Sequence, residues 1–179
     1  MKILDNFLAE DDFQSLYNLF LNDSSFPWYF NNSIAGNLHN LNDFQFCHTF
    51  FTTQNTYLDK PLSPFSHYLK PLLSKLSPHF LLRVKANLRP RTERNFLSKY
   101  HTDLSDLGNF TAIFYINSND GYTEFEDGTI VNSIQNRILI FPGNLKHRGA
   151  SPTDVKSRAL LNINYFPGKL NDNSFYLPS

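Results

Sequence analysis

Two histidines and one aspartate are spaced so that they could bind a metal ion. His101 and Asp103 are two positions apart, and in an extended segment such residues project to the same face, where both can reach one ion. His147 follows an apolar run at 138–141 and a turn at 142–144, which places it near a strand edge. Two histidines and a carboxylate form the facial triad that holds Fe(II) and leaves coordination positions open. A His-x-Asp motif also arises by chance, so a strand-end histidine beside an unrelated turn aspartate is the alternative.

A strand-like segment at 158–166 carries a guanidinium group and two amides. Alternation along a strand places Arg158, Asn162 and Asn164 on one face and apolar residues on the other. A face of this composition, shortly after His147, predicts the wall of a pocket. An outward, solvated face is the alternative.

The segment that precedes the His-x-Asp motif is rich in cationic residues. Lys85, Asn87 and Arg89 alternate with apolar residues and so share one face of a predicted strand. If that face turns inward, these residues make the pocket polar and cationic and can bind substrate; if it turns outward, it is a solvated edge. The loop at 89–99 adds Arg91 and Arg94, which would suit an acidic or phosphate-bearing substrate and a lid that closes over it. A solvated connector is the alternative.

The remaining sequence predicts the elements that position these residues. Apolar residues recur at helical spacing at 11–21 and 63–76, where Pro71 should kink or split the second helix. Short β-prone runs follow, and an earlier run at 44–51 should join the same sheets. The runs lie at 80–88, 97–103, 110–116, 122–125, 129–134, 137–141 and 158–166. We therefore expect one domain over 1–179, mainly β with N-terminal helices: a helical part at about 1–78 and a β-rich core at about 79–168, arranged as a sandwich or barrel.

The composition indicates a folded globular protein and gives no sign of a membrane-spanning or strongly charged one. The 179 residues are 41% hydrophobic and 16% aromatic, as in a folded globular chain. Lys+Arg and Asp+Glu both number 16, so no whole-protein charge attracts nucleic acid or an anionic membrane. Cys47 is the only cysteine and cannot form an internal disulfide. The apolar runs are too short to span a membrane, and the acidic N-terminus does not suit a signal peptide. We expect a cytoplasmic protein.

Together these features resemble a known family. His101, Asp103, His147 and Arg158, in this order on a β-rich segment, are similar to the Fe(II)- and 2-oxoglutarate-dependent dioxygenases, which have a double-stranded β-helix (jelly-roll) core buttressed by helices. Within this superfamily the chain resembles the prolyl 4-hydroxylase-like branch, which includes the hypoxia-sensing prolyl hydroxylases and small bacterial and phage members. The resemblance spans roughly 81–166 and includes the predicted strands at 111–117 and 136–141.

The resemblance implies a role for each residue. His101, Asp103 and His147 would bind Fe(II), and Arg158 would hold the distal carboxylate of 2-oxoglutarate through a bidentate, charge-assisted pair. Tyr115 matches a family tyrosine that reaches the same cosubstrate. Because Asp103 supplies a carboxylate ligand where halogenases leave room for a halide, the expected reaction is hydroxylation.

One position departs from the family pattern. The hypoxia-type members carry a tyrosine just before a proline in the strand that precedes the His-x-Asp motif, and this chain has Arg89 before Pro90. The resemblance therefore does not fix a prolyl specificity.

The sequence thus predicts a dioxygenase that uses Fe(II), O₂ and 2-oxoglutarate, releases succinate and CO₂, and is stimulated by ascorbate. A peptide or protein is the expected substrate, with proline as the first candidate, and no membrane partner is expected. Two alternatives stay open: a nucleic-acid-modifying oxygenase with the same iron site, suggested by the basic loop, and a non-catalytic jelly-roll binding module. The sequence does not define the oligomeric state.

Overall fold

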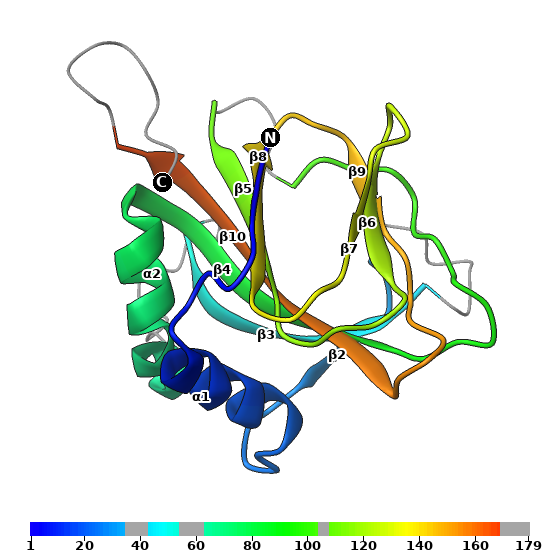
Figure 1. Cartoon of the computed structure of the whole chain (residues 1–179), viewed down its shortest axis with the longest axis horizontal. Coiled ribbons are helices and arrows are strands. Elements are labelled where there is room, and N and C mark those ends of the chain that lie inside the picture. Colours follow the sequence, from blue (N-terminus) through cyan, green and yellow to red (C-terminus); the bar gives the residue numbers. More distant parts are fainter. Residues whose placement is uncertain (35–42, 54–62, 104–107, 169–179) are drawn as a thin grey trace.

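The computed structural model describes residues 1–34, 43–53, 63–103 and 108–168. The strands are β1 (Lys2–Leu4), β2 (Tyr29–Asn31), β3 (Gln45–Thr52), β4 (Pro78–Pro90), β5 (Phe110–Tyr115), β6 (Tyr122–Phe125), β7 (Ile130–Asn132), β8 (Arg137–Pro142), β9 (His147–Gly149) and β10 (Ser157–Pro167). They form a large antiparallel sheet with the order β1-β8-β5-β10-β4-β3-β2, which faces a small one with the order β7-β6-β9 (Figure 1). This mainly β arrangement confirms the expected jelly-roll core.

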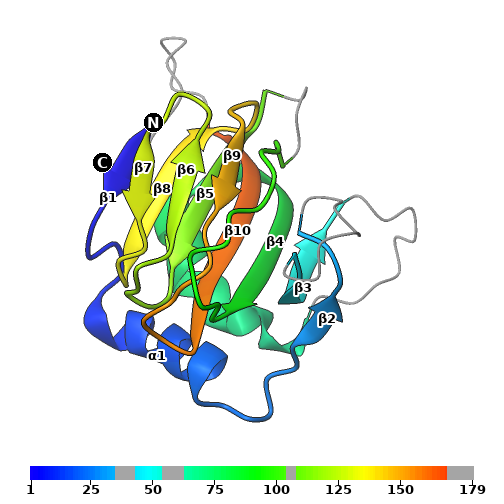
Figure 2. The same cartoon turned by 90° about the vertical axis from the view of Figure 1, so that its right-hand side faces the viewer.

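Helices α1 (Glu10–Leu21) and α2 (Lys70–Leu76) and the 3₁₀ helix η1 (Pro64–Leu69) cover the outer face of the large sheet (Figures 1 and 2). The predicted helix at 63–76 is split where Pro71 falls in the first turn of α2. A proline at that point loses no hydrogen bond, because the first N–H groups of a helix have no partner within it. Ser63 caps η1 by accepting a hydrogen bond from the Phe65 N–H.

Two apolar clusters hold the layers together. The larger one lies between the helices and the large sheet and includes Phe13, Leu72 and Phe114, all fully buried. The smaller one lies between the two sheets and includes Tyr115 and Phe141. Strand alternation explains both clusters, because successive residues of β5 point to opposite faces.

Strand β10 is the central element of the site. It pairs antiparallel with β4 on one side and with β5 on the other, and its register places Arg158 beside Arg89 and Asn162 beside Lys85. Its apolar residues Ala159, Leu161, Ile163 and Tyr165 join the core beneath the helices. The opposite face, led by Arg158, therefore turns toward the small sheet, as the pocket interpretation requires.

Some elements differ from the sequence-based expectation. The predicted strand at 97–103 is wrong: within it only Leu97 and His101 make isolated bridges, to Ala150 and His147. Strands β1, β2 and β9 were not predicted, because three residues are too few to show an alternating pattern. Since β1 pairs with β8, the N-terminal part supplies strands to the large sheet as well as helices. In the described residues, no helix is long and apolar enough to cross a membrane.

Candidate metal and cosubstrate site

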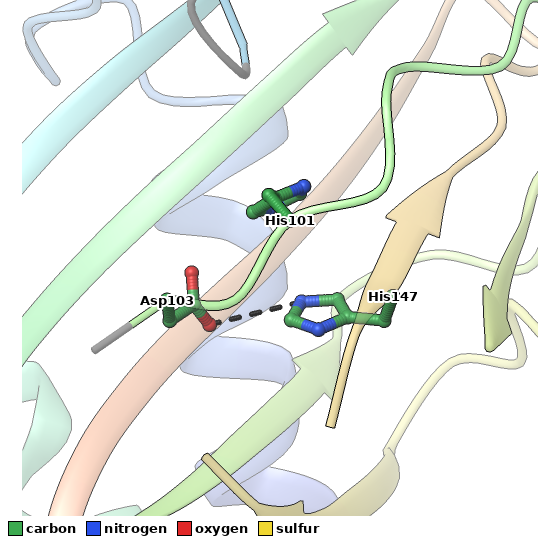
Figure 3. A group of neighbouring side chains, drawn as sticks. All are labelled: His101, Asp103 and His147. Carbon is green, nitrogen blue, oxygen red and sulfur yellow. Dashed lines mark ion pairs between the residues drawn. The ribbon is translucent and has the colours of Figure 1, made fainter. Parts of the chain in front are cut away.

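The three predicted metal ligands meet at one edge of the small sheet (Figure 3). His101 and His147, the first residue of β9, form an antiparallel bridge with backbone hydrogen bonds of 3.0 and 2.9 Å. This bridge sets their rings side by side, with centroids 4.8 Å apart. Asp103 follows two residues later, and one potential ligand atom from each of the three side chains lies within 4.8 Å of the others. The short β9 strand, which the sequence pattern did not reveal, thus completes the cluster.

The hydrogen bonds of the two histidines fix which ring nitrogen can bind a metal. The Nδ1 atom of His101 lies 3.1 Å from the Lys99 carbonyl oxygen, and that of His147 lies 3.1 Å from the Leu145 carbonyl oxygen. A carbonyl can only accept, so each Nδ1 carries the proton. Both Nε2 atoms are therefore left with a free lone pair, as metal ligation requires.

Asp103 is held in an ionised, oriented state. Its Oδ2 atom accepts a hydrogen bond of 2.7 Å from Asn162, and its Oδ1 atom accepts one of 3.1 Å from Arg83. Burial alone would raise the pKa of Asp103, but the charges of His147 and Arg83 and the Asn162 hydrogen bond lower it to about 2. At neutral pH, where His147 is uncharged, Arg83 and Asn162 continue to stabilise the carboxylate.

The donor set fits Fe(II). Burial lowers the pKa of His147, which keeps its imidazole neutral and able to coordinate. The Nε2 atom of His147 lies 3.8 Å from Oδ2 of Asp103, so a small closure would bring both to one ion. Two imidazoles and one carboxylate on adjacent segments are the ligands of a facial triad.

A cavity of about 300 Å³ opens beside the ligands. Its walls include residues of β4, β5, β6, β9 and β10, together with Ile34 and Gln45. The inward residues of β4 that line it are Arg83, Lys85, Asn87 and Arg89. The inward interpretation of this β4 face is therefore correct, and the solvated-edge alternative is wrong.

Arg158 lies at the end of the cavity away from Asp103. It is 4% exposed, and its Nε and Nη2 atoms donate to the hydroxyls of Ser133 (2.6 Å) and Thr123 (3.0 Å). No ion pair to Arg158 exists in the part of the chain that the structure describes. A buried guanidinium without a carboxylate partner is costly unless an anion binds there.

Tyr115 supports this end of the cavity from behind. Its ring lies 5.5 Å from the Arg158 guanidinium carbon, and its hydroxyl donates to Thr123 at 2.8 Å. Burial raises the pKa of Tyr115, so the phenol stays protonated. Because Thr123 Oγ1 accepts from both Tyr115 and Arg158, the Thr123 hydroxyl proton is free to donate into the cavity. A contact between Tyr115 and cosubstrate stays a prediction.

The other residues predicted to bind substrate lie in two separate regions, one at the cavity and one on the loop at 89–96. Asn162 lines the cavity and Asn164 lies beneath it, where both donate to Oδ2 of Asp103. Arg91 and Arg94 are exposed and line a separate hollow over 89–96. The Ser151 side chain and backbone anchor this loop through hydrogen bonds from Asn95 and Phe96. A role for these residues in binding substrate stays a prediction.

Sequence reasoning did not single out Arg83, Thr123 or Ser133. The alternation of β4 already placed Arg83 on the face of Lys85, which was the available signal. Thr123 and Ser133 gave none, since isolated hydroxyl residues are common in strands and turns.

The comparisons with known proteins bear on the fold. No protein-family model and no curated protein sequence matches the chain. A 2OG-Fe(II) oxygenase family member from Burkholderia pseudomallei superposes with a TM-score of 0.61 and 9% identity, over 91% of this chain and 84% of that one. A prolyl-4-hydroxylase from Pseudomonas putida gives 0.55 and 14%, over 92% and 91%.

A prolyl hydroxylase from Trichoplax adhaerens, solved with a peptide fragment of the hypoxia inducible factor oxygen degradation domain, gives a TM-score of 0.58 and 14% identity, over 92% and 82% of the two chains. The fold is therefore that of the Fe(II)- and 2-oxoglutarate-dependent oxygenases. Within that class it is shared with prolyl 4-hydroxylases, as the sequence resemblance predicted.

Proposed function

We propose that this protein is an Fe(II)- and 2-oxoglutarate-dependent dioxygenase that hydroxylates a peptidyl residue, with proline as the first candidate. One observation carries the proposal: a cavity of the family fold has a His-Asp-His cluster at one end and, at the other, a buried Arg158 that has no ion-pair partner among the described residues. A cation placed beyond a metal site suits a cosubstrate that chelates the metal and carries a second carboxylate.

We assign one group of residues to metal binding and another to orientation of the cosubstrate. His101, Asp103 and His147 would hold Fe(II), which when bound couples oxidative decarboxylation of 2-oxoglutarate to hydroxylation of a C–H bond. Arg158 would orient the cosubstrate through a charge-assisted pair, with the free Thr123 proton as an additional donor. In sum, 2-oxoglutarate, O₂ and R–H give succinate, CO₂ and R–OH.

A peptide substrate is supported by two observations. A fold neighbour is a prolyl hydroxylase in complex with a peptide. In this chain β2 is an edge strand of the large sheet and pairs with β3 at Gln45, which lines the cavity; its Tyr29 and Phe30 are 61% and 64% exposed. Exposed aromatic residues on an edge strand suit an extended peptide that adds main-chain hydrogen bonds.

The proposal is tested by turnover. Purified protein with Fe(II), O₂, 2-oxoglutarate and ascorbate is expected to release succinate, and proline-containing peptides from a screened library are expected to increase the rate and gain 16 mass units. Fe(II)-dependent succinate formation excludes the non-catalytic binding module. Stimulation by oligonucleotides instead of peptides would favour the nucleic-acid-modifying alternative.

Substitution of Phe30 tests where the peptide binds. Phe30→Ser is expected to raise KM for a stimulating peptide about tenfold with kcat unchanged, because the aromatic contact is made equally in the ground and transition states. Ile130→Ser, at an equally exposed apolar position (54%) on β7, is the matched control. An unchanged KM in Phe30→Ser would place the peptide elsewhere.

The loop arginines test the charge of the substrate. Replacement of both Arg91 and Arg94 by Gln is expected to leave peptide-independent succinate formation unchanged, and to slow hydroxylation several-fold at low salt and less at high salt. The reason is that exposed charges act mainly on association rate and are screened by salt. Equal hydroxylation rates at both salt concentrations would show that the loop is only a connector.

A further inference from the structure

Two buried arginines lie side by side at the cosubstrate end of the cavity. The β4–β10 register pairs Arg89 directly with Arg158, and directly paired residues on adjacent antiparallel strands have neighbouring side chains. Both line the cavity, and they are only 6% and 4% exposed. Two like charges at such a spacing repel each other, so the pair calls for a compensating anion.

Their hydrogen bonds show which guanidinium nitrogens are free. Arg89 Nη1 donates to the Gly149 carbonyl oxygen at 2.6 Å, and Arg89 Nη2 is buried without a partner among the described residues. Arg158 Nε and Nη2 donate to Ser133 and Thr123. The guanidinium also interacts with the Tyr115 hydroxyl, and no acceptor within hydrogen-bond distance of Nη1 is found in the described part of the chain. Each guanidinium thus retains one terminal nitrogen, and a carboxylate has two oxygens.

The guanidinium groups of Arg89 and Arg158 both lie close to Gly149. A Cβ atom at this position would lie 3.2 Å from Arg158 Nη1 and 3.7 Å from Arg89 Nη1. The glycine therefore lets both guanidinium groups approach β9 at the same point. The centroid of the Phe96 ring lies 5.2 Å from the Arg89 guanidinium carbon, so the two groups form a cation–π contact.

Among the described residues, no carboxylate forms an ion pair with either arginine. Burial and the charge of Arg158 lower the pKa of Arg89 to about 10, against the attraction of buried Asp43, so Arg89 is charged at neutral pH. Burial also lowers the pKa of Arg158, but a guanidinium keeps its proton in proteins. Asp43 acts on Arg89 only from beyond ion-pair distance.

We propose that Arg89 and Arg158 together bind the distal carboxylate of 2-oxoglutarate, each through its free terminal nitrogen. This inference rests on the proposed function and changes the interpretation of Arg89, which the sequence had suggested as a substrate residue. The metal ligands lie over Asn162 and Asn164, toward the opposite end of the same β10 face. A cosubstrate that chelates the metal therefore extends toward the arginine pair.

Calorimetric titration under anaerobic conditions, with Fe(II)-loaded and metal-free protein, tests the proposal. The ligands are 2-oxoglutarate and 2-oxobutanoate, which lacks the distal carboxylate. Arg89→Gln is expected to weaken 2-oxoglutarate binding about 10- to 100-fold and to leave 2-oxobutanoate binding within about twofold, because only the charge-assisted pair is lost. Lys70→Gln, an exposed position on α2, is the matched control for net charge and should leave both affinities unchanged.

Two further variants keep the test decisive. Arg89→Lys retains charge without the planar fork, so its affinity for 2-oxoglutarate should fall between those of the parent and Arg89→Gln; it also serves if the glutamine variant does not fold. The alternative is that Arg89 stabilises the fold through its attraction to Asp43. In that case Arg89→Gln and Asp43→Asn will lower the unfolding midpoint by similar amounts, and both variants will bind 2-oxoglutarate as the parent does. That result overturns the inference. A parent that binds no 2-oxoglutarate refutes the proposed function itself.

Discussion

His101→Ala is expected to reduce Fe(II) affinity by more than about 100-fold and to abolish succinate formation, with little change in the unfolding midpoint. The side chain is half-exposed, and its ring contacts His147 above the cavity and not the apolar core. Anaerobic titration with Fe(II), together with thermal unfolding of the metal-free protein, measures both effects. His67→Ala, which removes an exposed histidine of η1, is the matched control and should bind iron like the parent.

His147→Ala should lose iron equally but should also be less stable. His147 is 3% exposed and packs against Phe141 and Phe125, with ring centroids at 4.9 and 6.1 Å. Its truncation leaves a cavity between the sheets, at a cost of about 2–3 kcal/mol. Parent-like Fe(II) affinity in either histidine variant would remove these residues from the metal site.

The clustering of His101, Asp103 and His147 was predictable from the sequence because a metal site requires residue types that few other roles require. A His-x-Asp pair, a later histidine and an arginine at the head of the last long strand indicated this class of fold even without their contacts. The helix at 11–21 and the strand at 158–166 were also predictable, since both have long apolar periodicities. Short elements were not: β9 has three residues, and its pairing with β6 and the bridge to His101 place His147.

The surroundings of the site could not be predicted from the sequence and required the structure. Alternation put Lys85, Asn87 and Arg89 on one face but could not say which way that face turned, because a strand carries the same pattern in either orientation. The packing of the other face decides it, because Val84 and Ala86 join the core beneath the helices and the odd-numbered residues therefore turn toward the cavity. Likewise, the support of Asp103 by Arg83 joins residues 20 positions apart on different segments, and no spacing rule predicts such a contact.

Arg158→Ala should raise the dissociation constant for 2-oxoglutarate by two to three decades and leave Fe(II) affinity unchanged. Loss of one partner from a buried ion pair costs about 3–4 kcal/mol, which corresponds to that factor. The metal ligands lie toward the other end of the cavity and do not contact Arg158, so iron binding should be unaffected. Arg158→Lys should recover part of the affinity, because it restores the charge but not the two-pronged geometry.

The same substitution separates binding from folding. The Arg158 side chain packs against Gly121, where a Cβ atom would lie 2.8 Å from Arg158 Cδ, and it hydrogen-bonds Ser133 and Thr123. Arg158→Ala should therefore also lower the unfolding midpoint, and Arg158→Lys should do so less because its stem fills most of that space. If the loss were only structural, 2-oxobutanoate binding would fall together with 2-oxoglutarate binding. We expect the affinity of Arg158→Ala for 2-oxobutanoate to stay near that of the parent, since 2-oxobutanoate has no distal carboxylate for Arg158 to bind. An unchanged 2-oxoglutarate affinity in Arg158→Ala would assign the distal carboxylate to another residue.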